Sequence, residues 1–367
     1  MNNIVRELLT EIKEIKSFLL RRIFLITIIY IFLIPATVIS IALGSYNLSI
    51  SEVIKNLFNV NNPGSESSIA HVIIWQYRIP RTIAAIIAGA ILASAGTVIQ
   101  GVTRNPIASP FTLGISSASS FGAALTIIAG AKIFGLSQVI TQTPQGFMTI
   151  ATAALLFSFI QTILILALAY LKGFSPESII LVGIATTYIY SAGITFLQYF
   201  AGETHLREYV HWVIGDLMRI NWDRIYLFIP LLAISTTLVM YFAWDLNVLS
   251  LGDEIARSLG VNPRKTRFIT IFIASGSTAV VVSITGPIAF ICLMAPHIAR
   301  LAVGSDNRYL IPASVATGSL LLVISDTIAR ILLRPIELPV GAVTSLLGAL
   351  FFIFLYTRYK RHGVMNI

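Results

Sequence analysis

The chain has 367 residues, of which 56% are hydrophobic and only 11% are charged, and its formal net charge is +9. Because a soluble domain carries about 25% charged residues, this composition excludes a protein whose whole surface faces water. Lipid must be the solvent for much of the surface, and hydrophobic runs that recur along the chain predict one helical membrane bundle.

Residues 1–22 precede the first hydrophobic run and mix Glu and Lys with apolar residues. Ile4, Leu8, Ile12 and Ile15 recur at helical spacing. This pattern predicts a cytoplasmic amphipathic helix that lies on the membrane surface. A solvated N-terminal extension is the alternative.

Runs long enough to cross a bilayer fill the rest of the chain, since a spanning helix needs about 20 apolar residues. We predict an all-α membrane protein, a polytopic bundle of about ten transmembrane helices, with residues 23–367 as one transmembrane domain. The predicted spans are 23–43, 81–101, 112–131, 147–171, 178–201, 224–244, 267–286, 287–303, 309–330 and 338–357. The eighth is short and contains two prolines, a histidine and an arginine.

The placement of Lys and Arg predicts the orientation. With both termini in the cytoplasm, 16 of the 25 basic residues lie inside and 9 lie outside. This asymmetry follows the positive-inside rule and favours an even number of spans. It also accounts for the net charge without any nucleic acid.

The second predicted span carries a row of small residues and then a broken end. Gly89, Ala93 and Thr97 are four residues apart, which lets helix backbones approach closely in lipid. Asn105 and Pro106 interrupt the chain at the inner end. Because irregular backbone at membrane depth must be covered by protein or line a cavity, we predict a pore constriction at residues 105–108. A simple cytoplasmic turn is the alternative.

A second informative segment is a predicted short cytoplasmic helix over 250–260. It opens at Ser250, has Asp253 and Glu254 in its first turn and ends at Gly260. Its apolar stripe consists of Leu251, Ile255 and Leu259. Such a helix suits docking into a groove on a soluble partner, and a solvated helix without a partner is the alternative.

Motifs for catalysis or metal binding are not found in the sequence. His205 and His211 are six residues apart, which does not place them on one helical face, so no metal site is predicted. His297 and Arg300 share a face in the eighth span, and a structural contact between helices is favoured. No GxxxxGK[ST] phosphate loop occurs, so ATP-driven work by that route requires another polypeptide.

Several stretches together resemble the FecCD-type permeases of type II ABC importers, which carry cobalamin, ferric siderophores and haem. The resemblance runs from about residue 23 to the C-terminal region, and the extended N-terminus is not part of it. The stretches include RIPRTIAAIIAGAILASAG at 78–96, QGVTRNPIASPFTLG at 100–114, LGDEIARSLG at 251–260, GPIAFICLMAPHIARL at 286–301 and ELPVGAVTSLLGALFFIFL at 337–355.

The resemblance implies a multi-pass protein of the cell membrane that works as a homodimer. Two ABC ATPase subunits, which bind ATP and Mg, would dock on the cytoplasmic side, and this chain would bind no cofactor and have no catalytic residue. The residues matching the coupling helix are Leu251, Gly252, Asp253, Glu254, Ala256, Arg257, Leu259 and Gly260.

The resemblance also implies two further sites. An extracytoplasmic substrate-binding protein would dock through Arg78, Arg81 and Arg330. The cytoplasmic gate would involve Asn105 and Ile107 together with the turn at 175–178, which contains Ser175 and Pro176. The Pro176-Glu177 pair departs from the small hydroxyl residues expected in that turn.

The expected function is therefore the translocation pathway for an iron chelate, either a ferric siderophore or haem. Cobalamin is the alternative cargo, and molybdate is a further one. An intramembrane enzyme is disfavoured, because Asp326 lies in the ninth span without a nearby partner carboxylate in the sequence. An ion-coupled secondary transporter is disfavoured because buried ionisable relays are scarce.

Overall fold

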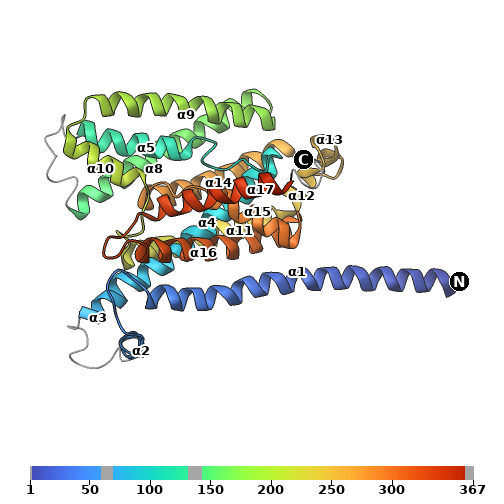
Figure 1. Ribbon diagram of the computed structural model, residues 1–367. Helices are drawn as coiled ribbons and strands as arrows, with labels where there is room; N and C mark the ends of the chain where they lie inside the picture. The colour runs from blue at the N-terminus through green and yellow to red at the C-terminus, as the bar shows by residue number, and fades with distance from the viewer. Residues whose placement is uncertain (1, 59–68, 131–142, 360–367) are drawn as a thin grey trace.

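The computed structural model describes residues 2–58, 69–130 and 143–359, and each secondary-structure element within these ranges is helical. The helices pack roughly side by side into one elongated bundle (Figure 1). The all-α fold class predicted from the sequence is confirmed.

Eight helices are long and apolar enough to cross a membrane, and two shorter apolar segments bring the described spans to the predicted ten. The second span is continuous from α3 (Ile69–Val72) through the π-helical turn η1 (Ile73–Arg78) into α4. The eight long helices, including α4, are α1 (Asn2–Ala42), α4 (Ile79–Thr103), α8 (Pro144–Leu171), α9 (Pro176–Tyr199), α11 (Trp222–Tyr241), α14 (Pro263–Thr285), α16 (Asn307–Ile331) and α17 (Val340–Tyr359). The short segments are α5 (Ile115–Ala124), continued by η2 (Leu125–Gly130), and α15 (Ile291–Val303).

Within the described ranges, four further helices lie outside the spans. They are α2 (Ile50–Phe58), α10 (Glu203–Val213), α12 (Ala243–Ser250) and α13 (Asp253–Ser258). Of these, α12 was not predicted: the sequence analysis ended the sixth span at residue 244 and began the next helix at 250. Leu246, Val248 and Leu249 are buried against the bundle, and this packing stabilises the helix. The sequence of the connection contains polar residues and does not indicate that it packs in this way.

Helix α4 is the centre of the bundle, and almost all of its residues are buried. Its small residues permit close packing on two sides. A Cβ added to Gly89 would lie 2.3 Å from the carbonyl oxygen of Gly318 in α16, and one added to Gly96 would lie 1.8 Å from that of Cys292 in α15. The predicted role of the small-residue row in helix packing is confirmed.

The two ends of the bundle carry different elements (Figure 1). The N-terminal part of α1, the end of α17 and helix α13 lie at one end, which we call the α13 end. Helices α2 and α10 and the start of the α3–η1–α4 helix lie at the opposite end, the α10 end. An even number of crossings explains why α1 begins where α17 ends; which end faces the cytoplasm remains a prediction from charge.

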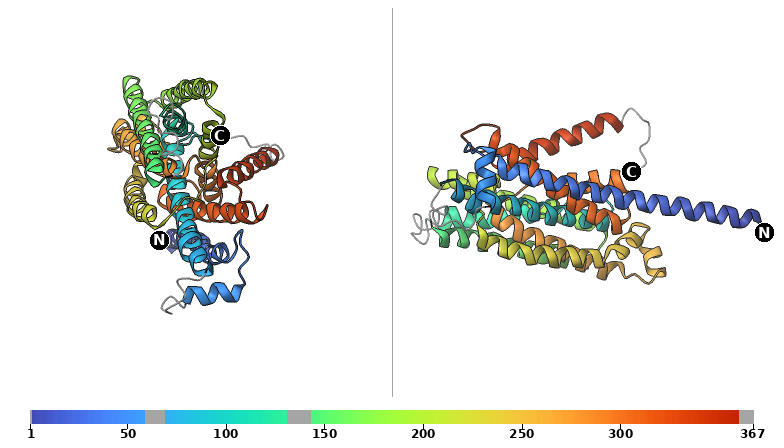
Figure 2. Two further views of the ribbon diagram at one scale, coloured as in Figure 1. Left: turned by 90° about the vertical axis from the view of Figure 1, so that its left-hand side faces the viewer. Right: turned by 90° about the horizontal axis from the view of Figure 1, so that it is seen from below.

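The N-terminal segment continues without a break into the first span, and its position on the membrane surface remains a prediction. Residues 2–42 form one helix of 41 residues, about 60 Å long, whose first part projects beyond the bundle (Figure 2). Neither Gly nor Pro occurs between residues 2 and 34 to end a helix before the span. The predicted amphipathic face of residues 1–18 concerns side chains outside the described part of the structure.

Candidate functional site

The predicted gate segment is an irregular turn at the α13 end. Helix α4 ends at Thr103, and Arg104 follows in the left-handed region with φ of 49°. The side-chain oxygen of Asn105 accepts a hydrogen bond of 3.0 Å from the backbone N–H of Ile107. This bond holds the turn in a shape that leaves Ile107 62% exposed. The predicted break in the helix is confirmed, and its role as a gate remains a prediction.

The second predicted gate segment is the start of α9. Ser175 caps this helix, with its hydroxyl oxygen accepting a bond of 3.2 Å from the N–H of Ser178. Pro176 occupies the first helical position, where proline is favoured because no N–H partner is needed. The departure of Pro176 from the family pattern is therefore compatible with a regular helix start.

The short helix predicted over 250–260 is present as α13, which is shorter, and its role in coupling remains a prediction. Ser250 belongs to the end of α12, and α13 starts at Asp253 because Gly252, with φ of 118°, turns the chain between the two helices. The predicted apolar stripe is confirmed as an exposed surface: Leu251, Ile255 and Leu259 are 59%, 47% and 57% exposed.

The residues of α13 divide into two groups. Glu254 and Arg257 are exposed, whereas Ala256 is buried against Val248, Leu249 and Val261. The sequence analysis grouped Ala256 with the contact residues, but the structure places it on the inner side of the helix.

Asp253 faces two arginines. Its carboxylate accepts two hydrogen bonds of 2.7 Å from Arg267 and also forms an ion pair with Arg104. The hydrogen bonds from Arg267, together with the charges of both arginines, hold the pKa of Asp253 below its usual value despite partial desolvation. Arg267 was not among the predicted site residues, and its position as the fifth residue of a span helix gives no signal of this contact.

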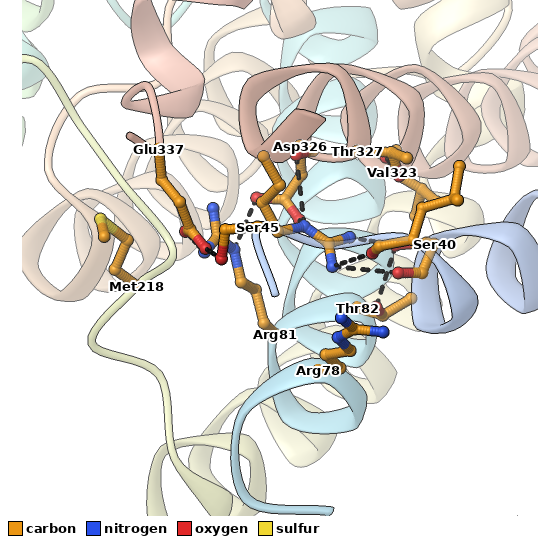
Figure 3. Close-up of polar contacts among 12 residues, drawn as sticks. Ser40, Ser45, Arg78, Arg81, Thr82, Met218, Val323, Asp326, Thr327 and Glu337 are labelled. Carbon is orange, nitrogen blue, oxygen red and sulfur yellow. Dashed lines mark hydrogen bonds and ion pairs between the residues drawn. The ribbon is translucent and has the colours of Figure 1, made fainter. Parts of the chain in front are cut away.

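At the α10 end, Arg78, Arg81, Asp326 and Glu337 lie in one cluster (Figure 3). Two of the three predicted docking arginines, Arg78 and Arg330, fasten the end of α1. Arg78 donates to the carbonyl oxygens of Ile41, Ala42 and Tyr46 at 3.0, 2.8 and 2.6 Å. Arg330 donates to the carbonyl oxygens of Ser40 and Leu43, both at 3.0 Å. Both arginines satisfy carbonyls that the last helical turn leaves unpaired.

The third arginine, Arg81, bridges two acids. Its Nε lies 2.8 Å from Asp326 and its Nη1 lies 2.5 Å from Glu337. Asp326 also lies 3.0 Å from Arg330 Nε. The three arginines are only 2–7% exposed, and they are paired within the protein, so their predicted contact with a soluble partner remains a prediction. Asp326 and Glu337, distant in sequence from Arg81, supply the missing charges.

Glu337 was missed by the sequence analysis because it lies in a connection between spans. Its second oxygen accepts a bond of 2.5 Å from the hydroxyl of Ser45. Burial raises the pKa of Glu337, but the charges of Arg81 and Arg330 and the hydrogen bonds outweigh it, so the pKa lies below the usual value.

A pocket of about 270 Å³ opens beside this cluster. Its lining includes all three arginines, Glu337 and three residues whose side chains are about half exposed or more, namely Tyr46, Tyr77 and Met218. Arg81 Nη2 is buried and has no hydrogen-bond partner among the described residues. The pocket therefore lies beside an arginine that keeps one unpaired guanidinium nitrogen.

His297 and Arg300 make the contacts between helices that the sequence favoured. Arg300 Nη2 donates to Gln100 of α4 at 2.9 Å. The imidazole of His297 lies edge-on to Phe351 and Phe352 of α17, with ring centroids 5.9 and 6.2 Å apart.

These features define a polytopic membrane protein with a short helix, α13, that exposes an apolar stripe at one end, and a buried charge cluster at the other. The model of the FecCD transport family matches residues 29–358, and the chain belongs to this family. It is a multi-pass permease subunit of an ABC importer of the FecCD type.

Individual relatives cover nearly the whole chain. A provisionally assigned ABC transporter permease protein of Methanocaldococcus jannaschii is 41% identical over 91% of this chain and 94% of its own. The Fe(3+)-citrate import system permease protein YfmE of Bacillus subtilis is 38% identical over 90% and 93%. A solved structure of an inward-facing ABC transporter, provisionally assigned to the metal-chelate type, superposes with a TM-score of 0.76 at 31% identity, over 90% and 98%.

Other relatives at 32–33% identity are named as permeases for different cargoes. They are the hemin permease of Yersinia pestis, the molybdate permease of Haemophilus influenzae and the vitamin B12 permease of Serratia proteamaculans.

Proposed function

We propose that this chain forms, as a homodimer, the pathway through which an iron chelate crosses the cell membrane. ATP hydrolysis would occur in two separate ABC ATPase subunits, so the chain itself is a transport subunit without enzymatic activity. A substrate-binding protein would deliver the cargo at the α10 end, which the charge asymmetry assigns to the outside.

The ATPase subunits are proposed to dock on α13. Leu251, Ile255 and Leu259 form an exposed apolar stripe on a short helix whose other face is anchored in the bundle. Anchored helices that present an apolar face are suited to insertion into a groove of a soluble partner. The gate segments at Asn105 and Ser175 lie at the same end, so a push on α13 has a short path to them.

The binding protein is proposed to dock over the pocket at the α10 end. The exposed rim of Tyr46, Tyr77 and Met218 would contact the partner, and an acidic side chain of the partner would reach Arg81 Nη2. Arginine binds carboxylates through directed hydrogen bonds. Arg78 and Arg330 would act there through the positive potential of the pocket rather than by direct contact, because their side chains are occupied by α1.

The cargo proposal rests on the similarity to the Fe(3+)-citrate permease, 38% identical over 90% of this chain. Cobalamin is the alternative, supported by a vitamin B12 permease that is 33% identical over 79% of the chain. The identity difference and the wider coverage favour the iron chelate.

The cargo is tested on the binding protein that associates with this permease. Its affinity is measured by calorimetry for ferric citrate, a ferric hydroxamate, hemin, cyanocobalamin and molybdate. We expect one of the iron compounds to bind at least about a hundredfold more tightly than cobalamin or molybdate. Preferential binding of cobalamin would replace the iron assignment by the alternative, and preferential binding of molybdate would reject both.

A further inference from the structure

The largest fully buried side chain in the described part of the structure is that of Arg267, which lies in α14 at the α13 end of the bundle. A buried guanidinium is stable only when its donors are paired. Arg267 donates through all three of its nitrogens: Nε to the carbonyl oxygen of Val102 at 3.3 Å, Nη1 to that of Phe174 at 3.2 Å, and Nη1 and Nη2 to the Asp253 carboxylate at 2.7 Å.

The three acceptors come from three separate segments, each connected to a predicted site. Val102 is in the last turn of α4, three residues before Asn105. Phe174, buried and with φ of 60°, directly precedes Ser175, which caps α9. Asp253 is the first residue of α13. One guanidinium therefore touches the chain beside both gate segments and the helix proposed to receive the ATPase.

Arg104 adds a second connection to the same carboxylate. It directly follows Thr103, the last residue of α4, its Nε donates to the carbonyl oxygen of Leu249 at 3.0 Å, and its Nη2 pairs with Asp253. The Asp253 carboxylate is thus held by one arginine from α14 and one from the gate turn itself. A displacement of α13 moves Asp253, and Asp253 cannot move without pulling on both arginines.

The physical properties of these groups suit the transmission of a displacement. A bidentate arginine–carboxylate pair is short and geometrically specific. The planar fork of Arg267 fixes its donors relative to one another, unlike the flexible single ammonium of lysine. Phe174 is packed in the main core cluster with Val102 and Ala108, so the two gate segments are already joined by apolar contacts.

We propose that Arg267 and Asp253 are positioning residues of transport, and that they link movement of α13 to both gate segments, Asn105–Ile107 and Ser175–Pro176. Arg104 supports this link from the gate side. The inference rests on the proposed function, because it takes α13 as the ATPase contact and these segments as the gate. It adds that both halves of the gate respond together, since they share one guanidinium.

The test uses the complete transporter, the permease with its ATPase subunits, in lipid vesicles. Ile107→Cys, a position 62% exposed, is labelled with a maleimide without nucleotide and with Mg-ATP plus vanadate. The variants Arg267→Lys and Asp253→Asn are made in this background. Arg308→Lys is the matched control, because Arg308 makes an Arg–Asp pair with Asp306 at the same end, with 2.7 Å between Nη2 and Oδ2, but contacts neither gate segment.

We expect the background protein and Arg308→Lys to change their labelling rate with nucleotide. Arg267→Lys and Asp253→Asn should reduce that change about tenfold, as expected for the loss of a charge-assisted hydrogen bond. In Arg267→Lys, whose position lies in α14 and outside the proposed ATPase contact, copurification of the ATPase and its rate of hydrolysis should stay within about twofold of the background. Retention of these two activities separates a lost link from a damaged fold.

Asp253→Asn is the less disruptive of the two variants, because the Asp253 carboxylate is only half-buried. A nucleotide-dependent change that persists in Asp253→Asn would overturn the inference. It would do so even if Arg267→Lys failed to fold. By contrast, an Ile107→Cys background that never responds to nucleotide would reject the proposed gate itself, and failure of the ATPase to bind the background protein would reject the proposed function.

Discussion

Arg81 of α4 and Asp326 of α16 form a buried ion pair, with Nε 2.8 Å from Oδ1 and side chains that are 8% and 0% exposed. Helix α1 is tied to the same cluster by Arg78 and Arg330. Three helices that lie far apart in the sequence thus meet at one network of charges.

We predict that Arg81→Gln destabilises the permease by about 3 kcal/mol or more, because Asp326 and Glu337 would lose a buried counter-charge. Arg308→Gln is the matched control, since the Arg308 side chain is 54% exposed; its effect should be about 1 kcal/mol or less. Thermal unfolding in detergent measures both. Equal shifts in the two midpoints would contradict the structural role of the buried pair.

Helix packing at α4 gives a second prediction. Gly96→Ala should destabilise by about 2 kcal/mol, since its Cβ would lie 1.8 Å from the carbonyl oxygen of Cys292 and backbone must move. Gly101→Ala, on the same helix, meets only Leu246 Cδ2 at 3.8 Å and should leave stability unchanged or raise it. Unfolding midpoints that move alike would show that close backbone approach is not what Gly96 provides.

Docking at the α10 end is tested without touching the buried arginines, whose replacement would disturb the fold. Met218, 47% exposed on the pocket rim, is changed to Glu and, as a matched control of opposite charge, to Lys. Met218→Glu should slow association with the binding protein about tenfold at low salt, because partner carboxylates are repelled, and Met218→Lys should not. Surface plasmon resonance at two salt concentrations distinguishes them. Similar losses in both variants would argue that shape, and not charge, governs this contact.

The proposed ATPase contact is tested by charge reversal in the first turn of two helices. Glu254 is the second residue of α13 and Glu203 is the first of α10 at the opposite end, and both are exposed. Glu254→Arg should reduce ATP-dependent transport about tenfold while insertion is normal, whereas Glu203→Arg should not, since it lies far from α13. Coupling in vesicles and ATPase copurification are the measurements, and transport at the unaltered rate in Glu254→Arg would exclude this residue from the contact.

The lowered pKa of Glu337 gives a prediction about acid stability. A carboxylate with a folded pKa below the unfolded one adds stability that is present above the unfolded value, about 4.3, and is lost as pH falls through the folded value. Thermal midpoints should therefore be insensitive to this group from pH 8 to 5. Below about pH 4 the difference between the parent protein and Glu337→Gln should shrink. A difference that grows on acidification would reverse the assigned sign.

The spans were predictable because the signal in each is long and local. Runs of about 20 apolar residues recur, and helices such as α8 and α14 begin within four residues of their predicted starts. The break after α4 was also predictable, since Asn105 and Pro106 are adjacent in sequence. The second span was placed too late, at 81 instead of Ile69, because Gln76 and Arg78 made its first turns look like a loop.

The charge network could not be predicted from the sequence, because its members are not local in sequence. Arg81 lies 245 residues from Asp326 and 256 from Glu337, and only the packing of α4 against α16 makes them neighbours. The pairing of Asp253 with Arg267 spans 14 residues but needs the turn at Gly260, with φ of 81°, between α13 and α14. The sequence therefore identified candidate residues such as Arg81 and Asp253, and the structure was needed to identify the residues that pair with them.

The measurement that tests the central claim most directly is uptake of radioactive iron, supplied as ferric citrate, into vesicles that contain the permease, its ATPase subunits and its binding protein. The account predicts uptake that requires ATP, is reduced about tenfold or more by Leu251→Asp in the exposed stripe of α13, and is not competed by excess cyanocobalamin or molybdate. Uptake that proceeds equally without ATP, or that Leu251→Asp leaves unchanged, would contradict it.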